Sequence, residues 1–144
     1  MAVFDPKQVS VLILDYRIQD WHEGGDVIHA NFRVDHGELS IGAGGTGVFV
    51  QHPDESGELV LQLKQHSRDN NYLDSLRRSQ RQSIRSFVPL TLSIRDMLNE
   101  DVVTAEQGYF TVAPPYIRGN AANPVTWTMV FERMAMRLEV GLFN

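Results

Sequence analysis

A glycine-rich run is the first feature of the sequence that could bind a ligand. Residues 42–47, Gly-Ala-Gly-Gly-Thr-Gly, match the pattern G-x-G-x-x-G, which holds the pyrophosphate of a dinucleotide where it joins a strand to a helix. Residues 48–50, Val-Phe-Val, have strand character instead, and no phosphate-binding lysine follows the glycines. We therefore interpret residues 36–47 as a flexible loop and expect no nucleotide or other cofactor.

The histidines and the acidic residues near them are the next candidates, as metal ligands. His22, His29 and His36 are spaced by seven residues, so neighbouring members would point to opposite faces of an extended strand. They form neither an H-x-H nor an H-E-x-x-H unit. The acidic cluster at residues 20–26 lacks the spacing of an EF-hand loop. We expect surface histidines, a solvated acidic turn and no metal.

The sequence contains no recognisable nucleophile with its base. The absence of cysteine excludes thiolate zinc sites, iron–sulfur clusters and cysteine nucleophiles, and no G-x-S-x-G elbow occurs. The aromatic and methionine side chains at residues 127–136 are interpreted as core rather than as a cofactor site. We predict that the protein is not an enzyme.

Length and composition predict one compact domain over residues 1–144, with 42% hydrophobic and 22% charged side chains. The formal charge of -5 argues against a general affinity for nucleic acid or anionic membranes. The longest apolar runs have the length of strands, so we expect no membrane insertion. The N-terminal residues do not have the pattern of a secretion signal.

Charge is distributed unevenly along the chain. Residues 1–58 contain three basic and ten acidic side chains, whereas residues 68–85 contain five arginines and two aspartates. Complementary surfaces on copies of the chain would explain this division, although monomeric proteins also show it.

Short runs in which β-branched or aromatic residues alternate with polar ones predict a mainly β protein. The expected strands are residues 8–14, 16–21, 27–35, 48–52, 58–65, 87–95, 102–112 and 126–140. One short helix is expected after residue 67, with Tyr72, Leu73 and Leu76 as its apolar stripe and Ser67 among its candidate caps. The apolar parity changes within residues 126–140, so a bulge or sheet change is expected near Glu132.

Strands with one helix, and no alternation of strands with helices, predict an antiparallel β-sandwich or a partly open barrel. Pro114 and Pro115 cannot donate to a ladder, so a loop is expected from residue 113 to residue 124.

The order of these segments resembles the tail tube proteins of contractile-tailed bacteriophages over nearly the whole chain. The resemblance rests on a Trp-His-Glu-Gly-Gly-Asp turn at residues 21–26, the strand at 56–65, the helix at 67–76, the Phe-Val-Pro-Leu strand at 87–96 and the Pro-Pro loop. Residues 14–16 and 117–125, and the extra Val88, depart from the family pattern. These departures affect the expected contacts between subunits more than the expected fold.

The resemblance implies a homo-oligomer of six-membered rings, stacked helically into a hollow tube with a continuous inner β-barrel. It also implies sheath, tape measure and baseplate proteins as partners, transient passage of double-stranded DNA, a location in the virion tail and assembly in the bacterial host cytoplasm. Pairing of free sheet edges between copies, and an acidic balance that avoids holding DNA, agree with this use.

The resemblance and the strand alternation together predict which residues face the lumen and which reach a neighbouring ring. The predicted lumen-side residues are Val27, His29, Asn31, Arg33, Asp35, Val48, Val50 and His52, with parts of residues 102–112 and 126–137. The predicted inter-ring residues are Gly37, Gly42, Gly44, Gly45, Gly47, Pro114 and Pro115. The arginines at 77, 78 and 81 are expected to face outward or towards the sheath.

Three alternatives remain open at this stage. The chain could be a tube-like baseplate or terminator ring protein, or the tube subunit of a contractile secretion or pyocin-type device. From another class, a monomeric β-barrel that binds a small ligand would be recognised by an enclosed apolar pocket.

Overall fold

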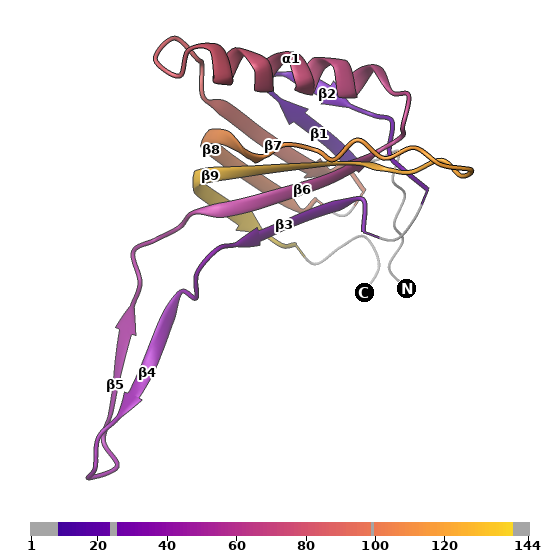
Figure 1. Ribbon diagram of the computed structural model, residues 1–144. Coiled ribbons are helices and arrows are strands. Elements are labelled where there is room, and N and C mark those ends of the chain that lie inside the picture. The colour runs from indigo at the N-terminus through magenta and orange to yellow at the C-terminus, as the bar shows by residue number, and fades with distance from the viewer. Residues whose placement is uncertain (1–8, 24–25, 99, 140–144) are drawn as a thin grey trace.

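The computed structural model describes residues 9–23, 26–98 and 100–139. Nine strands and one helix follow one another in this part of the chain (Figure 1): β1 Val9–Ile13, β2 Tyr16–Ile18, β3 Ile28–Phe32, β4 Gly37–Ile41, β5 Gly47–Gln51, β6 Gly57–Leu63, α1 Arg68–Gln82, β7 Leu90–Asp96, β8 Val102–Val112 and β9 Val125–Arg137. The mainly β class with one helix is confirmed. The helix α1 is not long and apolar enough to cross a membrane.

Seven strands form one antiparallel sheet in the order β2-β1-β7-β8-β9-β6-β3, and the remaining two, β4 and β5, pair only with each other. The large sheet curls into a half-barrel, with α1 lying across its open side (Figure 1). The β4–β5 hairpin projects away from the sheet at the end opposite α1. A seven-stranded sheet that does not close leaves edge strands at both ends of its order.

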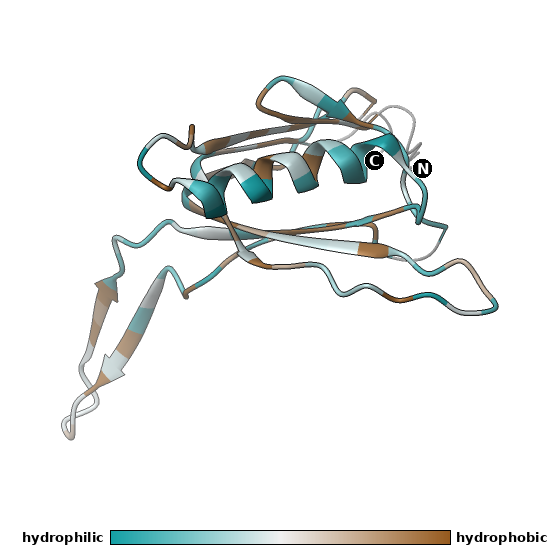
Figure 2. Ribbon diagram, turned by 45° about the horizontal axis from the view of Figure 1, so that its top comes forward, coloured by the Kyte–Doolittle hydropathy of each residue, from teal (hydrophilic) through white to brown (hydrophobic). Residues whose placement is uncertain are grey.

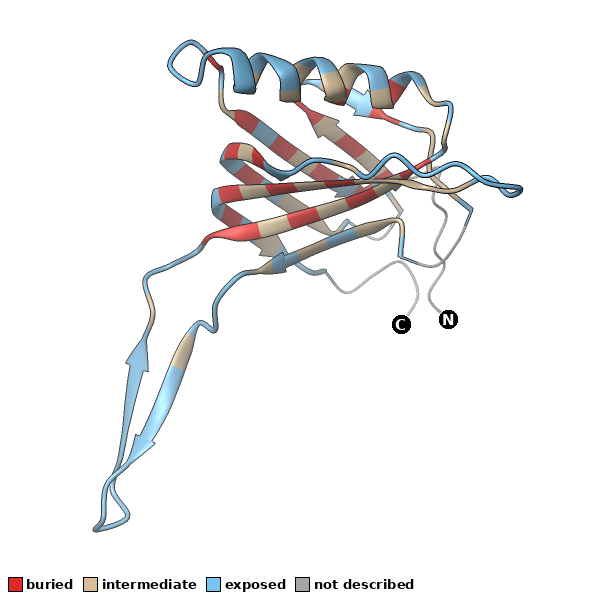
Figure 3. Ribbon diagram, viewed as in Figure 1, coloured by how far each residue is buried: buried red, intermediate tan, exposed pale blue. Residues whose placement is uncertain are grey.

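Strict alternation of apolar residues places the core on the concave face, towards α1. In β6, Leu59, Leu61 and Leu63 are fully buried while the residues between them are half-buried. Trp127, Met129 and Phe131 continue this face on β9. Figure 3 shows the resulting alternation of buried and less buried positions along the strands. The interior of the curl is therefore filled with side chains.

The helix is fixed at its N-terminus by the predicted cap. The Ser67 hydroxyl accepts from the Asp69 backbone N–H at 3.0 Å. The buried Asp69 carboxylate in turn accepts from the Tyr16 hydroxyl at 2.8 Å and from the backbone N–H of Gln19 at 2.8 Å. Tyr72 stacks on Tyr16 with ring centroids 3.9 Å apart. These contacts attach α1 to the segment that begins at β2.

A corner in β8 and β9 divides the sheet into two walls. The buried parity changes from Ala105 to Gly108 on β8 and from Phe131 to Met134 on β9, as the sequence predicted for β9. The register of β7 with β8 shifts here, and Gln107 has a φ of 56°, which is typical of a bulge residue. A Cβ on Gly108 would collide with the Phe131 ring, so glycine permits the tight packing at this corner.

The interpretation of residues 36–47 as a flexible loop is wrong. Gly37–Ile41 is β4 and Gly47–Gln51 is β5, joined by a short tip in which Gly45 has a φ of 83°. Two of the glycines leave room for large neighbours, because a Cβ on Gly37 would meet the Phe49 ring and one on Gly47 would meet Ile41. Glycine here serves close packing within strands as well as a turn.

Candidate assembly surfaces

The convex side of the sheet carries mostly polar and β-branched side chains, and we call it the polar face. Across β3, β6, β9 and β8 it follows the register Asn31–Glu58–Val130–Tyr109. His29 lies beside Val60 in the next row. An open groove of about 400 Å³ crosses this face between Arg33, Tyr109 and Glu132.

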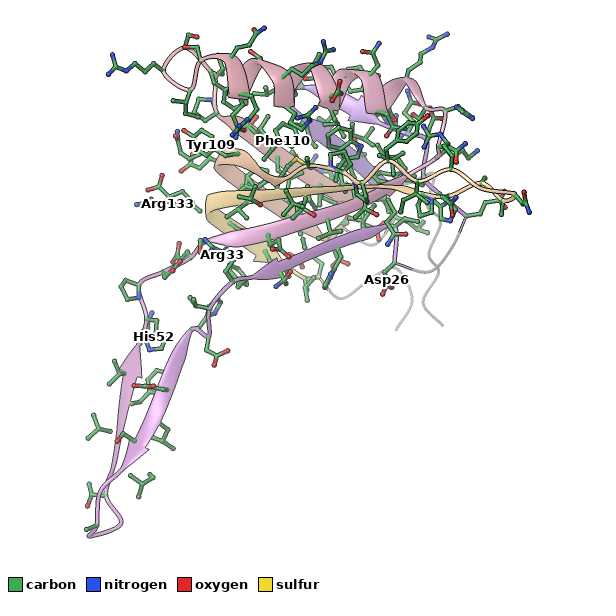
Figure 4. The ribbon with its side chains drawn as sticks, viewed as in Figure 1. Asp26, Arg33, His52, Tyr109, Phe110 and Arg133 are labelled. Carbon is green, nitrogen blue, oxygen red and sulfur yellow. The ribbon has the colours of Figure 1, made fainter. Side chains whose placement is uncertain are left out.

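The structure brings three of the predicted lumen residues together and separates the others. His29 and Asn31 lie exposed on β3, and Arg33 follows directly after it. Val27 is half-buried just before β3. Val48 and Val50 belong to the projecting hairpin and are not part of the large sheet. Figure 4 shows His52 at the base of the hairpin and Arg33 at the end of β3.

The β4–β5 hairpin has one face more apolar than the other. Leu39 pairs with Phe49, and Ile41 pairs with Gly47, so Leu39, Ile41 and Phe49 share a face. The opposite face carries Glu38, Ser40, Val48 and Val50. Leu39 and Phe49 are 66% and 64% exposed. Large apolar side chains this accessible on a projecting element indicate a surface that another chain covers.

Residues 33–36 and 52–56, which we call the neck, connect the hairpin to the sheet. The His36 carbonyl accepts from the backbone N–H of His52 at 2.8 Å. The His52 Nδ1 lies 2.9 Å from the Asp35 carbonyl oxygen, and the His36 ring packs edge-on to Phe32 with centroids 4.4 Å apart. Asp35 and His52, two of the predicted lumen residues, therefore lie in the neck and not in the large sheet.

The two predicted inter-ring segments lie at different ends of the molecule. The hairpin that contains Gly37 and Gly47 projects in one direction, and the loop after β8 extends from the other end of the sheet (Figures 1 and 2). In that loop Tyr116 is 83% exposed, and the Arg118 guanidinium lies 4.1 Å from the Tyr116 ring centroid. The two segments therefore cannot reach the same point on a neighbour.

Arg78 and Arg81 are exposed on α1 and form what we call the basic helix face, whereas Arg77, four positions after the buried Leu73, is half-buried and does not face fully outward as predicted. Arg77 and Arg78 bind the Asp74 carboxylate at 2.8 and 2.9 Å, and Arg81 is exposed. Because these pairs are close to solvent, they add little to stability. Figure 2 shows that most residues along α1 are hydrophilic or neutral, with a few hydrophobic ones between them. This basic helix face remains accessible to an acidic partner.

The structure also places the candidate metal ligands and the glycine-rich run that the sequence offered. Within the described residues no three histidine, aspartate or glutamate side chains are grouped to hold a metal ion. The G-x-G-x-x-G run lies at the tip of the hairpin, followed by β5 and not by a helix, so it lacks the amino end of a helix that a pyrophosphate site needs.

Comparison with known sequences decides the family. A sequence model of the bacteriophage PhiTE tail tube protein family matches residues 19–139. The chain belongs to this tail tube family. It is accordingly a structural protein of the phage tail and not an enzyme. No curated protein sequence matches the chain significantly.

Solved structures share the fold of this tail tube protein at low sequence identity. The sheath/tube terminator of PVC, an extracellular contractile injection system, has a TM-score of 0.61 and 11% identity, with 95% of this chain and 98% of that chain covered. A chain of the PVC sheath-tube complex in the extended state has a TM-score of 0.60 and 10% identity, with 94% and 92% covered. The tube-terminating cap of the anti-feeding prophage has a TM-score of 0.59 and 9% identity, with 96% and 93% covered.

Sequence reasoning missed one residue that attaches α1 to the edge of β8 in the tail tube protein. Gln80 of α1 makes two hydrogen bonds to the backbone of Phe110 on β8, at 2.8 and 3.0 Å. Gln80 follows Leu73 by seven positions and so lies on the same face of the helix. That spacing, together with a polar side chain on the buried side, is the signal that could have identified it.

Proposed function

We propose that this tail tube protein forms six-membered rings that stack into a hollow conduit for genome ejection inside a contractile sheath. The observation that carries the proposal is the exposed apolar β4–β5 hairpin on a half-open sheet, in a chain of the tail tube family. Single copies leave both features exposed to water. Repeated head-to-tail contacts that close a ring cover them.

In this proposal the polar face lines the bore. Four strands from each of six copies make roughly two dozen strands, enough for a water-filled barrel. Arg33, Glu58 and Glu132 mix both charge signs on this face or at its border. Such a surface suits transient DNA passage, because a bore rich in lysine or arginine would bind phosphate and retard the DNA. His29 and Asn31 would then be lumen residues.

The hairpin and the loop after β8 supply contacts between copies. The apolar face of the hairpin, with Gly37, Gly42, Gly44, Gly45 and Gly47 in its backbone, would pack on one neighbouring copy. Pro114 and Pro115, at the other end of the subunit, would contact a different one. Val48 and Val50 would therefore lie at a contact and not in the lumen.

Other tail proteins would bind the outside and the ends of the tube. The basic helix face suits an acidic segment of the sheath, because arginines with few buried contacts keep their charge available. A similar fold occurs in a sheath-tube complex. Tape measure and baseplate proteins would be the remaining partners, and assembly would take place in the host cytoplasm. Charge reversal at Arg78 and Arg81 should abolish sheath attachment and leave bare tubes.

A terminator ring is the second candidate, because two of the similar structures are a tube terminator and a terminating cap. The tube of a contractile secretion or pyocin-type device is a third, and neighbouring capsid and terminase genes would argue against it. A monomeric ligand-binding barrel is disfavoured by the filled interior, where Leu59, Met129 and Phe131 are fully buried.

Negative-stain electron microscopy of the purified chain, alone and with baseplate components, tests the proposal. Stacked annuli or tubes are the expected result, and immunogold labelling should mark the whole tail length of intact particles. Labelling at only one end of the tail would favour the terminator. A chain that stays monomeric even with baseplate components present contradicts both ring proposals.

A further inference from the structure

The β4–β5 hairpin receives little support from the rest of the subunit. Every residue of β4 and β5 is exposed except Gly37, which is half-buried. An open hollow of about 400 Å³ lies between Phe49 on β5 and Met134 on β9, so the base of the hairpin does not pack tightly against β9. Among the described residues, the neck is therefore the main connection that can hold the hairpin in its direction (Figure 1).

The second strand of the neck is stiff and is anchored to the sheet. Pro53 fixes its own φ and disfavours helical conformations of the residue before it. The Ser56 backbone N–H donates to Asp54 Oδ1 at 2.8 Å, which closes an Asx turn. The Glu55 carbonyl accepts from the backbone N–H of Met134 on β9 at 2.9 Å. This strand of the neck therefore follows the sheet as one fixed segment.

The first strand of the neck has fewer constraints of its own. Its Arg33 backbone N–H donates to the Ser56 carbonyl at 3.0 Å, which ties its start to the stiff strand. Val34 and Asp35 come next, and both are exposed and neither is proline. Contacts from the stiff strand are therefore needed to fix the chain where it enters β4.

His52 supplies these contacts with two different groups. Its backbone N–H donates to the His36 carbonyl at 2.8 Å, and its ring Nδ1 lies 2.9 Å from the Asp35 carbonyl oxygen. A carbonyl oxygen only accepts, so Nδ1 carries the proton and donates. His52 thus binds two successive carbonyls of the opposite strand at the point where the hairpin begins. Figure 4 shows its position at this junction.

We infer that His52 is a positioning residue that keeps the β4–β5 hairpin pointing in one direction before a second copy binds. The backbone bond alone would let the two strands twist about a single contact. The bond from Nδ1 adds a second contact one residue away and prevents this rotation. A hairpin that already has its direction loses less conformational entropy when it binds a partner. The role belongs to the single chain and goes beyond the proposed assembly.

Distances between two spin labels on the single chain test this role. Gly44→Cys places one label at the hairpin tip, where an added Cβ meets nothing within 4 Å, and Ser79→Cys places the other on the exposed side of α1. The absence of native cysteine makes the labelling specific. We expect one narrow distance distribution. His52→Phe retains a ring but has no donor, and we expect it to lose the single narrow distribution.

Two further variants separate the Nδ1 bond from other effects of substitution. His52→Asn keeps an N–H donor at a similar distance from the backbone and should restore the narrow distribution. Gln51→Ala changes the preceding residue and should leave the distribution narrow. A narrow distribution with His52→Phe, or a broad one with native His52, overturns the inference. Equal broadening by His52→Asn overturns the assignment to Nδ1. Unchanged circular dichroism of each variant verifies that the sheet is folded.

Assembly provides an independent measurement of the same role. The critical concentration for tube formation should rise about three- to tenfold with His52→Phe, since loss of one hydrogen bond changes an equilibrium by about this factor. It should stay unchanged with His52→Asn. An unchanged value with His52→Phe contradicts a role of the hairpin direction in assembly. If the chain with native His52 never assembles, the proposed function is wrong, and the label distances alone decide the role of His52.

Discussion

The side-chain amide of Gln80 makes both of its backbone hydrogen bonds to one residue of another element, Phe110. The Phe110 N–H donates to Oε1 at 2.8 Å, and Nε2 donates to the Phe110 carbonyl at 3.0 Å. β7 begins at Leu90, opposite Gly108, so Gln80 lies where a further β7 residue would otherwise bond. α1 is thereby attached directly to the strand edge that it covers.

Replacing Gln80 with alanine should destabilise the subunit. Gln80→Ala leaves a partly buried donor and acceptor without their partner, at a cost of about 1–3 kcal/mol in the free energy of unfolding. Urea denaturation followed by circular dichroism measures it. Gln82→Ala, at the exposed end of the same helix, is the matched control and should change stability by less than about 0.5 kcal/mol. Equal effects of the two substitutions would contradict the role of Gln80.

A Cβ at the corner of the sheet should be poorly tolerated. Gly108→Ala would bring a methyl group into the Phe131 ring and against Leu90, and overpacking of this kind costs about 1–3 kcal/mol. The melting temperature reports the loss. Gly44→Ala at the hairpin tip, where an added Cβ meets nothing within 4 Å, should leave the melting temperature nearly unchanged. A stable Gly108→Ala variant would show that the corner can relax.

Stability should fall at alkaline pH because of two tyrosines. The hydrogen bond to Asp69, followed by burial, raises the pKa of Tyr16 above its ordinary value of 10.0. Burial, followed by the charge of Asp15, raises the pKa of Tyr72. A raised pKa in the folded state favours the protonated form, so this stabilisation is complete below about pH 10 and is lost as the pH rises above it.

Urea unfolding between about pH 8 and pH 11 measures this dependence. Tyr16→Phe should be less stable than the unmodified chain at the lower pH, because the hydrogen bond to Asp69 is gone, and should lose less stability as the pH rises. An identical fall in both proteins would exclude Tyr16 as a source of the effect.

The apolar face of the hairpin should be needed for assembly and not for folding. Leu39→Asp places a charge on the face shared with Phe49, and assembly should be lost by electron microscopy and light scattering. Because Leu39 is exposed in the single copy, its stability should change by less than about 0.5 kcal/mol. Ser40→Asp on the opposite face is the control and should still assemble. Normal tubes from Leu39→Asp would refute this role.

Local patterns in the sequence predicted much of the sheet and its helix. The alternation at Leu59, Leu61 and Leu63 and the cap at Ser67 depend on near neighbours in the chain, and both are confirmed. The hairpin was missed because a glycine-rich sequence is compatible with a flexible loop and also with paired strands. The pairing of β4 with β5, in which the Phe49 ring packs over Gly37, distinguishes the two cases.

The candidate surfaces were harder to predict, because they depend on which segments the fold separates. Alternation put His29 and Asn31 on one face, as the structure has them. It could not reveal that Val48 leaves the sheet, because the change of direction occurs in the neck through contacts such as that of His52 with Asp35. Helical spacing from Leu73 puts Gln80 on the buried side of α1, but its partner Phe110 is 30 positions away and no local pattern identifies it.

The corner at Gln107 has a mechanical consequence. β8 and β9 run through it without interruption, so the wall that carries α1 and the wall that carries the polar face share the same two strands. Force applied to α1 would pass to the opposite wall along covalent backbone and its ladder of hydrogen bonds, with no intervening linker to absorb it. The subunit should therefore respond to a pull from outside as one stiff body.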